Sequence, residues 1–105
     1  GWLGFEGHAL TPKLAESLQL KTTEGIIITA IVRNGPAHKA GLEPGDIIAG
    51  IDGKKVKSGQ DALAVISGKQ PGQKVTLQIN RNGRGYSVTA TTITRPPQAI
   101  SEVKQ

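Results

Sequence analysis

The stretch of sequence that decides the fold is GPAHKAGLEPGDII, residues 35–48. Pro36 is suited to a helix start and Gly41 to the position just past a helix end, so one or two helical turns are predicted here. Glu43-Pro44-Gly45 then predicts a tight turn. Residues 46–51 alternate as a strand does. The stretch therefore predicts a short helix, a turn and a strand in direct succession.

Upstream of this stretch, the sequence predicts one helix and one strand. Thr11-Pro12 is typical of a helix start, with Thr as the N-cap and Pro at the first helical position. Leu14 and Leu18 follow one turn apart. A short helix is therefore predicted from Thr11 to about Leu20. Residues 26–32 are short and rich in β-branched side chains, which favours a buried strand.

Downstream, two dipeptides predict hairpin turns. Asp52-Gly53 leads from the strand at 46–51 into a short strand at 54–56. Asn82-Gly83 joins the alternating strand at 75–79 to a strand from Tyr86 to about Ile93. These pairings are local, which predicts antiparallel strands.

Between the two hairpins, the sequence predicts a second helix from about Gly59 to Ser67. Ser58 and Asp61 have the spacing of a capping box, with Asp in place of the preferred Glu. The apolar residues that follow recur at helical spacing, and Gly68 closes the helix.

The chain is long enough for one domain, with 105 residues and 11.0 kDa. Its elements alternate without βαβ units, so we expect a mostly β, α+β fold: five or six antiparallel strands and two short helices in a partly open barrel or sandwich. We expect the domain to span residues 1–95. Pro96-Pro97 ends the predicted order, and residues 96–105 are expected to be a frayed or extraneous tail.

Several kinds of function are not supported by the residues. There is no Cys, and His8 and His38 lack metal-ligand spacing, so neither a metal site nor a cofactor is predicted. No serine lies in a nucleophile elbow and no glycine-rich stretch completes a P-loop, so the domain itself is not expected to be an enzyme. The longest apolar run is far below the ~20 residues of a membrane helix, and no membrane contact is expected.

The net charge of +5 raises nucleic acid as a partner, but the cations are spread over several loops and strand ends. Only Trp2, Phe5 and Tyr86 could stack on bases. A nucleic-acid partner is therefore not expected.

The opening residues Trp2-Leu3-Gly4-Phe5 suggest a binding site. A glycine lets neighbouring amides converge as an anion-binding nest. If Phe5, Glu6, Gly7 and His8 continue as a strand with an unpaired edge, a peptide could add to that edge with its carboxylate in the nest. The predicted helix at 59–66 could form the opposite wall. Alternatively, Leu3 and Phe5 only fill the core.

Three segments in order resemble a PDZ domain. Trp2-Leu3-Gly4-Phe5 resembles the Gly-Leu-Gly-Phe carboxylate-binding loop of the family, residues 35–42 resemble its GPAxxAGL helix, and residues 45–53 resemble its GDxIxxIDG strand and turn. The order of the elements is similar to the permuted PDZ domains of bacterial HtrA-type serine proteases, and most of all to the DegS branch.

The resemblance implies a regulatory role and a set of site residues. The backbone amides of Leu3, Gly4 and Phe5 would hold a peptide carboxylate, and the strand at Phe5, Glu6, Gly7 and His8 would pair with the peptide. The pocket for the last side chain would be lined by Leu3, Phe5, Ile28, Leu63 and Ile66. Where many PDZ domains have a His that selects a hydroxyl, this chain offers Gly59 or Gln60, so an apolar C-terminus is expected.

The resemblance also implies a parent protein and a location. The parent would be a periplasmic serine endopeptidase that is homotrimeric and anchored to the inner membrane. Its PDZ domain would sense the C-termini of misfolded proteins in the envelope stress response and contact the parent's own protease domain. This domain alone is expected to be a monomer. The alternative is a docking or scaffold module of another parent, such as a membrane metalloprotease or a secretion-system protein.

Overall fold

Six strands and three short helices make up the part of the chain that the structure, a computed structural model, describes: residues 1–20 and 24–94. The elements in chain order are β1 (Phe5–Ala9), α1 (Pro12–Ser17), β2 (Ile26–Ile31), α2 (Pro36–Lys39), β3 (Ile47–Ile51), β4 (Lys54–Lys55), α3 (Gly59–Ser67), β5 (Lys74–Arg81) and β6 (Arg84–Thr91). The third helix is α2, the segment for which one or two turns were predicted. The predicted tail at 96–105 lies outside the described residues.

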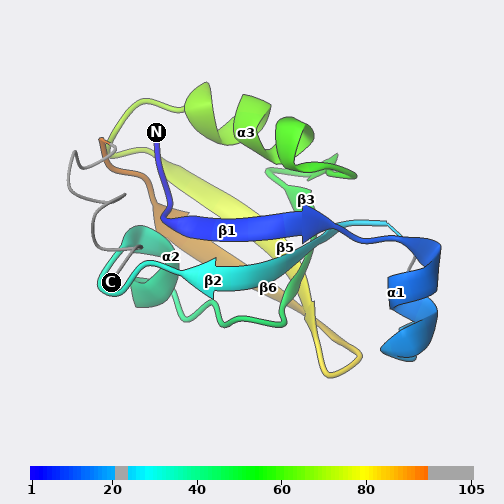
Figure 1. Cartoon of the computed structure of the whole chain (residues 1–105). Coiled ribbons are helices and arrows are strands. Elements are labelled where there is room, and N and C mark those ends of the chain that lie inside the picture. Colours follow the sequence, from blue (N-terminus) through cyan, green and yellow to red (C-terminus); the bar gives the residue numbers. More distant parts are fainter. Residues whose placement is uncertain (21–23, 95–105) are drawn as a thin grey trace.

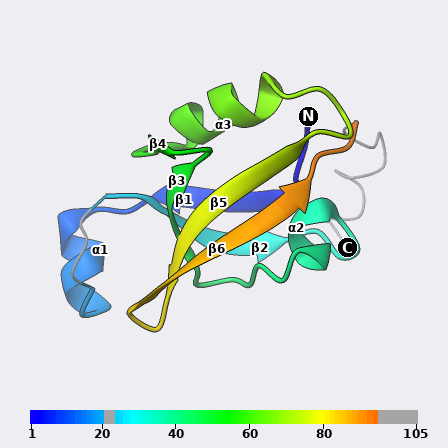
Figure 2. The same ribbon diagram turned by 180° about the vertical axis from the view of Figure 1, so that it is seen from behind.

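The strands form one antiparallel sheet in the order β1-β2-β3-β5-β6, with β4 paired to β3 (Figures 1 and 2). β1 and β6 are therefore the two edges. An isolated bridge between Trp2 and Ile93 draws the ends of these edges together, so the sheet curls into a partly open barrel. The predicted fold class is confirmed.

The main core lies inside this curled sheet. Val75, Leu77 and Ile79 alternate with more exposed neighbours along β5 and are buried, as the sequence pattern predicts. They join Ile28 and Ile48 in the main cluster. A smaller cluster forms under α1 from the buried residues Leu10, Ala15 and Ile47. None of the described helices is long and apolar enough to cross a bilayer.

Both predicted hairpin turns form. Asp52 and Gly53 have φ of 51° and 80°, and Asn82 and Gly83 have φ of 54° and 79°. Positive φ at both central residues gives the turn the twist of the strands it joins. The strand after Asp46 begins at Ile47, one residue later than predicted, because the Asp46 carboxylate accepts a hydrogen bond from the Glu43 amide and holds Asp46 in the turn.

The helix α1 is shorter than predicted. Thr11 caps it as expected, with Oγ1 accepting from the Leu14 amide at 3.0 Å. It ends at Ser17, because Gln19 adopts a left-handed φ of 57° and the Leu20 amide donates back to the carbonyl of Ala15 at 2.8 Å. This is a Schellman ending without glycine. It turns Leu20 toward the small cluster, where it packs.

The helix α3 spans the predicted residues, but its cap differs in one bond. Ser58 Oγ accepts from the Asp61 amide at 3.2 Å, as in a capping box. The Asp61 carboxylate accepts from the amide of Lys57, one residue before the N-cap, at 3.1 Å. The box is therefore not reciprocal. Gly68 closes α3 as predicted.

Candidate functional site

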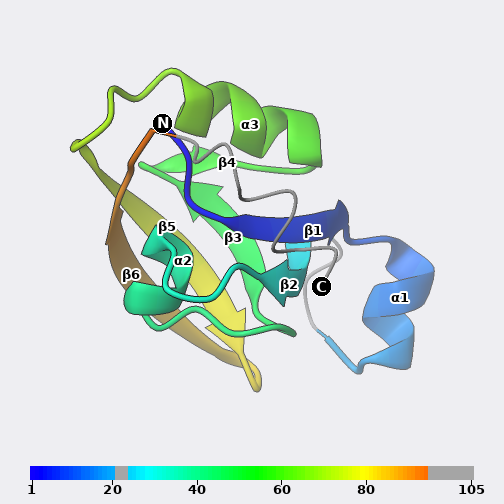
Figure 3. The same cartoon turned by 60° about the vertical axis from the view of Figure 1, so that its left-hand side comes forward.

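Helix α3 lies alongside the edge strand β1 (Figure 3). Residues of both elements line a groove between them. It encloses about 240 Å³. Its lining is entirely apolar or glycine: Gly1, Trp2, Phe5, Gly7, Ile26, Gly59, Ala62, Leu63 and Ile66. A groove of this composition is suited to an apolar side chain and disfavours a charged one.

The first wall of the groove is β1, which among the described strands pairs with β2 alone. The Val32 amide donates to the Gly4 carbonyl at 2.9 Å and the Leu10 amide to the Gly25 carbonyl at 2.8 Å, so both ends of β1 are in hydrogen-bonded pairs. The ladder has a bulge between Glu6 and Gly7 whose extra residue, Thr29, lies on β2, so the alternation of such pairs is kept along β1. The intervening backbone of Phe5 and Gly7 therefore faces the open edge. A strand that approaches this edge would meet their free backbone groups.

The opposite wall is one face of α3. Gly59, Ala62, Leu63 and Ile66 are three or four residues apart, the spacing that places side chains on one side of a helix. Leu63 is 64% exposed, although it is large and apolar. An exposed leucine inside an apolar groove indicates a surface that a ligand could cover.

The loop at residues 2–5, at the end of the groove, is anchored by three consecutive carbonyls that accept hydrogen bonds from other segments. The Trp2 carbonyl accepts from Ile93 at 3.2 Å, the Leu3 carbonyl from Ala37 at 2.8 Å, and the Gly4 carbonyl from Val32 at 2.9 Å. Their donors lie after β6, in α2 and after β2. The loop is thus fixed by three separate parts of the fold.

These bonds also orient the loop's amides. All described peptide bonds are trans, so each N–H points opposite to the carbonyl of the preceding residue. The amides of Leu3, Gly4 and Phe5 therefore point away from the three anchoring segments. Among the described residues, no hydrogen bond uses the Leu3 or Gly4 amide as its donor. Converging free amides of this kind suit a carboxylate.

Gly4 makes this geometry possible. Its φ of 81° is in the left-handed region, and a Cβ built there would lie 2.8 Å from Cη2 of the Trp2 indole. Glycine alone avoids both the backbone strain and the contact. The conformation of the loop therefore requires glycine at position 4.

An ion pair positions the end of α3. The Lys69 ammonium donates to the Asp52 carboxylate in the β3–β4 turn. Hydrogen bonding to Lys69, with a further bond from the Thr76 amide at 2.8 Å, lowers the pKa of Asp52. The helix wall is therefore tied to the sheet by an ion pair, and the Asp52 carboxylate in it stays ionised at neutral pH.

The family model described as "PDZ domain" matches residues 3–92, which is most of the chain. The chain belongs to the PDZ family.

This PDZ domain is related to the HtrA/DegP-like periplasmic serine proteases. A relative from Bartonella henselae, "Probable periplasmic serine endoprotease DegP-like", is 34% identical over 88 residues, which cover 84% of this chain and 17% of the relative. A relative of the same name from Pseudomonas putida is 36% identical over 84 residues, 80% of this chain and 18% of its own. The chain spans about a fifth of the length of the curated relatives it matches.

Solved structures agree with this placement. The HtrA-type protease AlgW with a decapeptide is 44% identical, with a TM-score of 0.83 over 92% of this chain and 30% of that chain. The HtrA3 PDZ domain bound to a phage-derived ligand (FGRWV) has a TM-score of 0.75 at 19% identity, over 86% of this chain and 82% of that chain. The second comparison shows the shared fold.

The structure of the PDZ domain separates the predicted pocket residues into two sets. Phe5, Leu63 and Ile66 line the groove. Leu3 and Ile28 are 2% and 1% exposed and belong to the main core. The lining from β2 is Ile26, which the sequence interpretation did not include. Ile26 and Ile28 have the same parity on the strand, so no sequence pattern distinguishes them.

The four residues predicted to pair with a peptide strand differ in the direction of their backbone groups. Phe5 and Gly7 turn their backbone toward the open edge, whereas the ladder alternation turns that of Glu6 and His8 toward β2. The side chains of Glu6 and His8 are exposed. Trp2, Gly7, Gly59 and Ala62 line the groove without having been predicted as pocket residues, and the helical spacing of Gly59 and Ala62 from Leu63 and Ile66 was the available signal.

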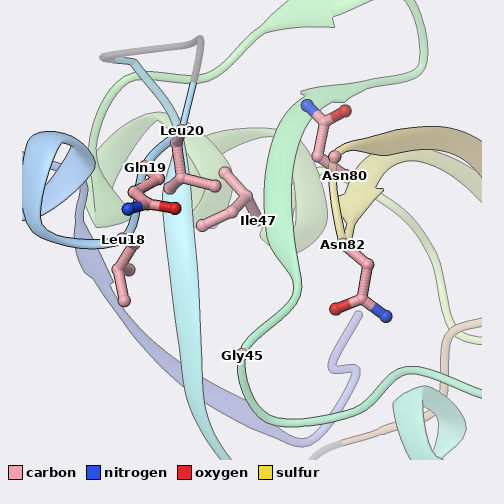
Figure 4. A pocket seen from close by; sticks show the side chains of 8 residues that line it. Leu18, Gln19, Leu20, Gly45, Ile47, Asn80 and Asn82 are labelled. Carbon is pink, nitrogen blue, oxygen red and sulfur yellow. The ribbon is translucent and has the colours of Figure 1, made fainter.

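A larger hollow lies at the other end of the PDZ domain, between the end of α1 and the β5–β6 turn (Figure 4). It encloses about 460 Å³. Leu18, Leu20 and Ile47 lie on one side of it, and the carboxamides of Asn80 and Asn82 lie on the other. The groove along β1 is the better candidate site, because within residues 1–20 and 24–94 oriented amides, an open strand edge and an apolar lining coincide only there.

Proposed function

We propose that this PDZ domain binds the free C-terminal end of another polypeptide that has an apolar last residue. The observation that carries the proposal is the orientation of the Leu3, Gly4 and Phe5 amides at the end of an apolar groove, beside the open edge of β1. The ligand would lie along β1 as an added strand, a recognised mode of peptide binding.

In this arrangement, each part of the ligand has a partner. The carboxylate accepts from the three loop amides, and the last side chain enters between Phe5, Leu63 and Ile66. Leu3 and Ile28 belong to the core cluster that also contains Ile66 and against which Phe5 packs. Further along, the ligand backbone pairs with Gly7, and His8 lies near the ligand strand.

The magnitudes predict weak binding. Burial of one apolar side chain contributes ~1.5–3 kcal/mol and each charge-assisted hydrogen bond ~1.5–3 kcal/mol, against ~4–15 kcal/mol for the freedom lost on association. We expect a dissociation constant near the micromolar range. The glycine at the start of α3 offers no side chain to select a hydroxyl, so affinity should follow the apolar character of the last residue.

The relatives support both the ligand class and the parent. AlgW, 44% identical to this chain, has been solved with a decapeptide and with a tripeptide. We infer that this domain belongs to an HtrA-type serine endopeptidase of the periplasm, where it recognises exposed C-termini of misfolded proteins and regulates proteolysis in the envelope stress response. It would act on the parent's own protease domain, in a homotrimeric parent. The relatives favour this parent over a metalloprotease or a secretion-system scaffold.

Calorimetric titration tests the proposal. Decapeptides ending in Phe, Val or Leu are compared as free acids and as C-terminal amides. Amidation removes the negative charge of the carboxylate to which the loop amides donate, and we expect it to weaken binding at least tenfold, which is about 1.4 kcal/mol. Equal affinity of the two forms would overturn carboxylate capture.

A further inference from the structure

The second edge of the sheet, along β6, also carries unpaired backbone groups. The Thr92 amide donates to the Gln73 carbonyl at 2.9 Å, and the β5–β6 pairing continues from there without a bulge. Hydrogen-bonded and non-hydrogen-bonded pairs alternate in such a ladder, so the backbone of Gly85, Ser87 and Thr89 points away from β5. These three residues form the open edge of β6.

The open edge of β6 is accessible. Gly85, Ser87 and Thr89 are all exposed, and for Gly85 this exposure is that of the backbone itself. None of the hydrogen bonds between described residues uses their amides or carbonyls outside the β5–β6 ladder. Just beyond β6, another segment does pair on this same side: the Ile93 amide donates to the Trp2 carbonyl at 3.2 Å. The edge is thus competent to accept a strand.

A hollow adjoins the open edge of β6, where α2 lies beside the end of this strand (Figure 2). It encloses about 310 Å³. Its apolar lining includes Pro36, Ala40 and Ile93, and Ile93 is 40% exposed. The hollow could take one apolar side chain of a strand that pairs with β6.

The charges beside this edge are positive. Lys39 lines the hollow, and Arg84 lies at the other end of the open edge. Both are exposed, and neither forms an ion pair among the described residues. The nearby Glu43 carboxylate is already engaged by Arg81 at 3.3 Å. Two free cations that flank a strand edge complement acidic residues.

We propose that the open edge of β6 and the α2 hollow bind an extended acidic segment of a partner protein. The segment would pair with Gly85, Ser87 and Thr89, place an apolar side chain in the hollow, and set carboxylates against Lys39 and Arg84. A second copy of this chain fits less well, because each copy carries a net charge of +5. The site needs no free carboxyl terminus, so it is independent of the groove along β1.

The probe is a hexapeptide of alternating Glu and Val, acetylated and amidated so that it has no terminal carboxylate. Amide exchange is followed residue by residue by NMR on the 105-residue chain, and affinity by titration. We expect at least tenfold slower exchange at Ser87 and Thr89 with saturating probe. A matched hexapeptide of Gln and Val should bind at least fivefold more weakly. Protection of β1 in place of β6, or equal binding of both probes, would overturn the proposal.

Two matched variants separate backbone from side chain. Thr89→Pro removes an outward-facing N–H that the β5–β6 ladder does not use, and edge strands tolerate such a proline. Thr89→Ala removes the side chain and keeps the N–H. We expect at least tenfold weaker probe binding for Thr89→Pro and less than twofold change for Thr89→Ala. Equal effects of the two would contradict strand pairing.

A third variant does not depend on how well the proline is tolerated. Lys39→Glu replaces an exposed cation in the hollow, and we expect it to weaken binding of the Glu-Val probe at least fivefold. An unchanged affinity would refute the electrostatic part of the proposal. Leu63→Lys, in the groove along β1, should leave binding of the Glu-Val probe unchanged while it abolishes binding of C-terminal peptides. The β6 proposal and the C-terminal proposal can therefore fail independently.

Discussion

Asp46 and Arg81 form a bidentate ion pair that joins the start of β3 to the end of β5. Nε and Nη2 of Arg81 donate to the two carboxylate oxygens of Asp46 at 2.8 and 2.7 Å. The Asp46 side chain is 3% exposed, and the pair raises the pKa of Arg81, which keeps it protonated. Arg81 also donates to the Gly41 carbonyl at 2.8 Å. One arginine therefore fixes the turn that follows α2.

Removal of Arg81 should destabilise the fold more than removal of both partners. Arg81→Met leaves the buried Asp46 carboxylate without its cation, whereas Arg81→Met with Asp46→Asn leaves no buried charge. We expect Arg81→Met to lower the midpoint of thermal unfolding by at least about 5 °C, and the double variant to recover part of that loss. Calorimetry measures both. A double variant less stable than the single one would contradict this account.

Gly4→Ala should impair ligand binding. Alanine at a φ of 81° costs about 1 kcal/mol, and its Cβ would displace the Trp2 indole from the loop at residues 2–5. We expect at least tenfold weaker binding of a free-acid peptide. Gly53→Ala is the matched control, because φ is 80° there and nothing lies within 4 Å of the added Cβ. The control should lose similar stability and keep its affinity; equal affinities in both variants would exclude the loop from the site.

Leu63→Lys should abolish binding while the domain stays folded. Leu63 is exposed, so its replacement leaves the core intact, but a lysine would place a charge in the apolar groove. We expect at least a tenfold loss of affinity. Ala64→Lys adds the same charge to an exposed position of α3 that does not line the groove. An effect as large in Ala64→Lys would show that charge alone, without the groove, governs binding.

Asp52→Asn should change the pH dependence of stability. The pKa of Asp52 is lowered from 3.8 by Lys69, so its stabilising contribution is complete above that value and disappears as the pH falls through the lower folded-state pKa. Asn tolerates the left-handed turn position. We expect the variant to be less stable than the parent sequence by about 1 kcal/mol at pH 7 and equally stable at about pH 2. Denaturant unfolding across pH measures this; a constant difference would refute it.

Ser58→Ala should weaken α3 and with it one wall of the groove. The serine hydroxyl accepts from the Asp61 amide at the helix start. Loss of such a cap costs about 1 kcal/mol in the free energy of unfolding. Ser67→Ala, at the other end of α3, lacks a capping role and should change stability by less than about 0.5 kcal/mol. Urea unfolding of the two variants compares them, and equal losses would contradict the cap.

Much of the fold was predictable because its signals are local. The proline and glycine around α2, the two hairpin dipeptides and the caps of α1 and α3 each act within a few residues. The early end of α1 was not predictable in this way. Gln19 has no strong preference for the left-handed conformation, and the packing of Leu20 under α1 accompanies that ending.

The candidate site was predictable only in part. Residue types indicated the loop amides and the apolar face of α3, since a glycine between large apolar residues and a helical spacing are visible in the sequence. The selection of Ile26 over Ile28 for the lining, and of Phe5 and Gly7 for the open edge, follows from strand register. Register is fixed by contacts between distant segments.

The amino-acid sequence alone determined the order of elements, the turn positions and the family resemblance, because backbone preferences and caps depend on near neighbours. Only the tertiary structure decided that the carbonyls of Trp2, Leu3 and Gly4 bind three separate segments, and so which way their neighbouring amides point. The orientation of each of these peptide planes is set by the hydrogen bond that its carbonyl accepts. The donors of these bonds lie about 30 to 90 residues away in the chain.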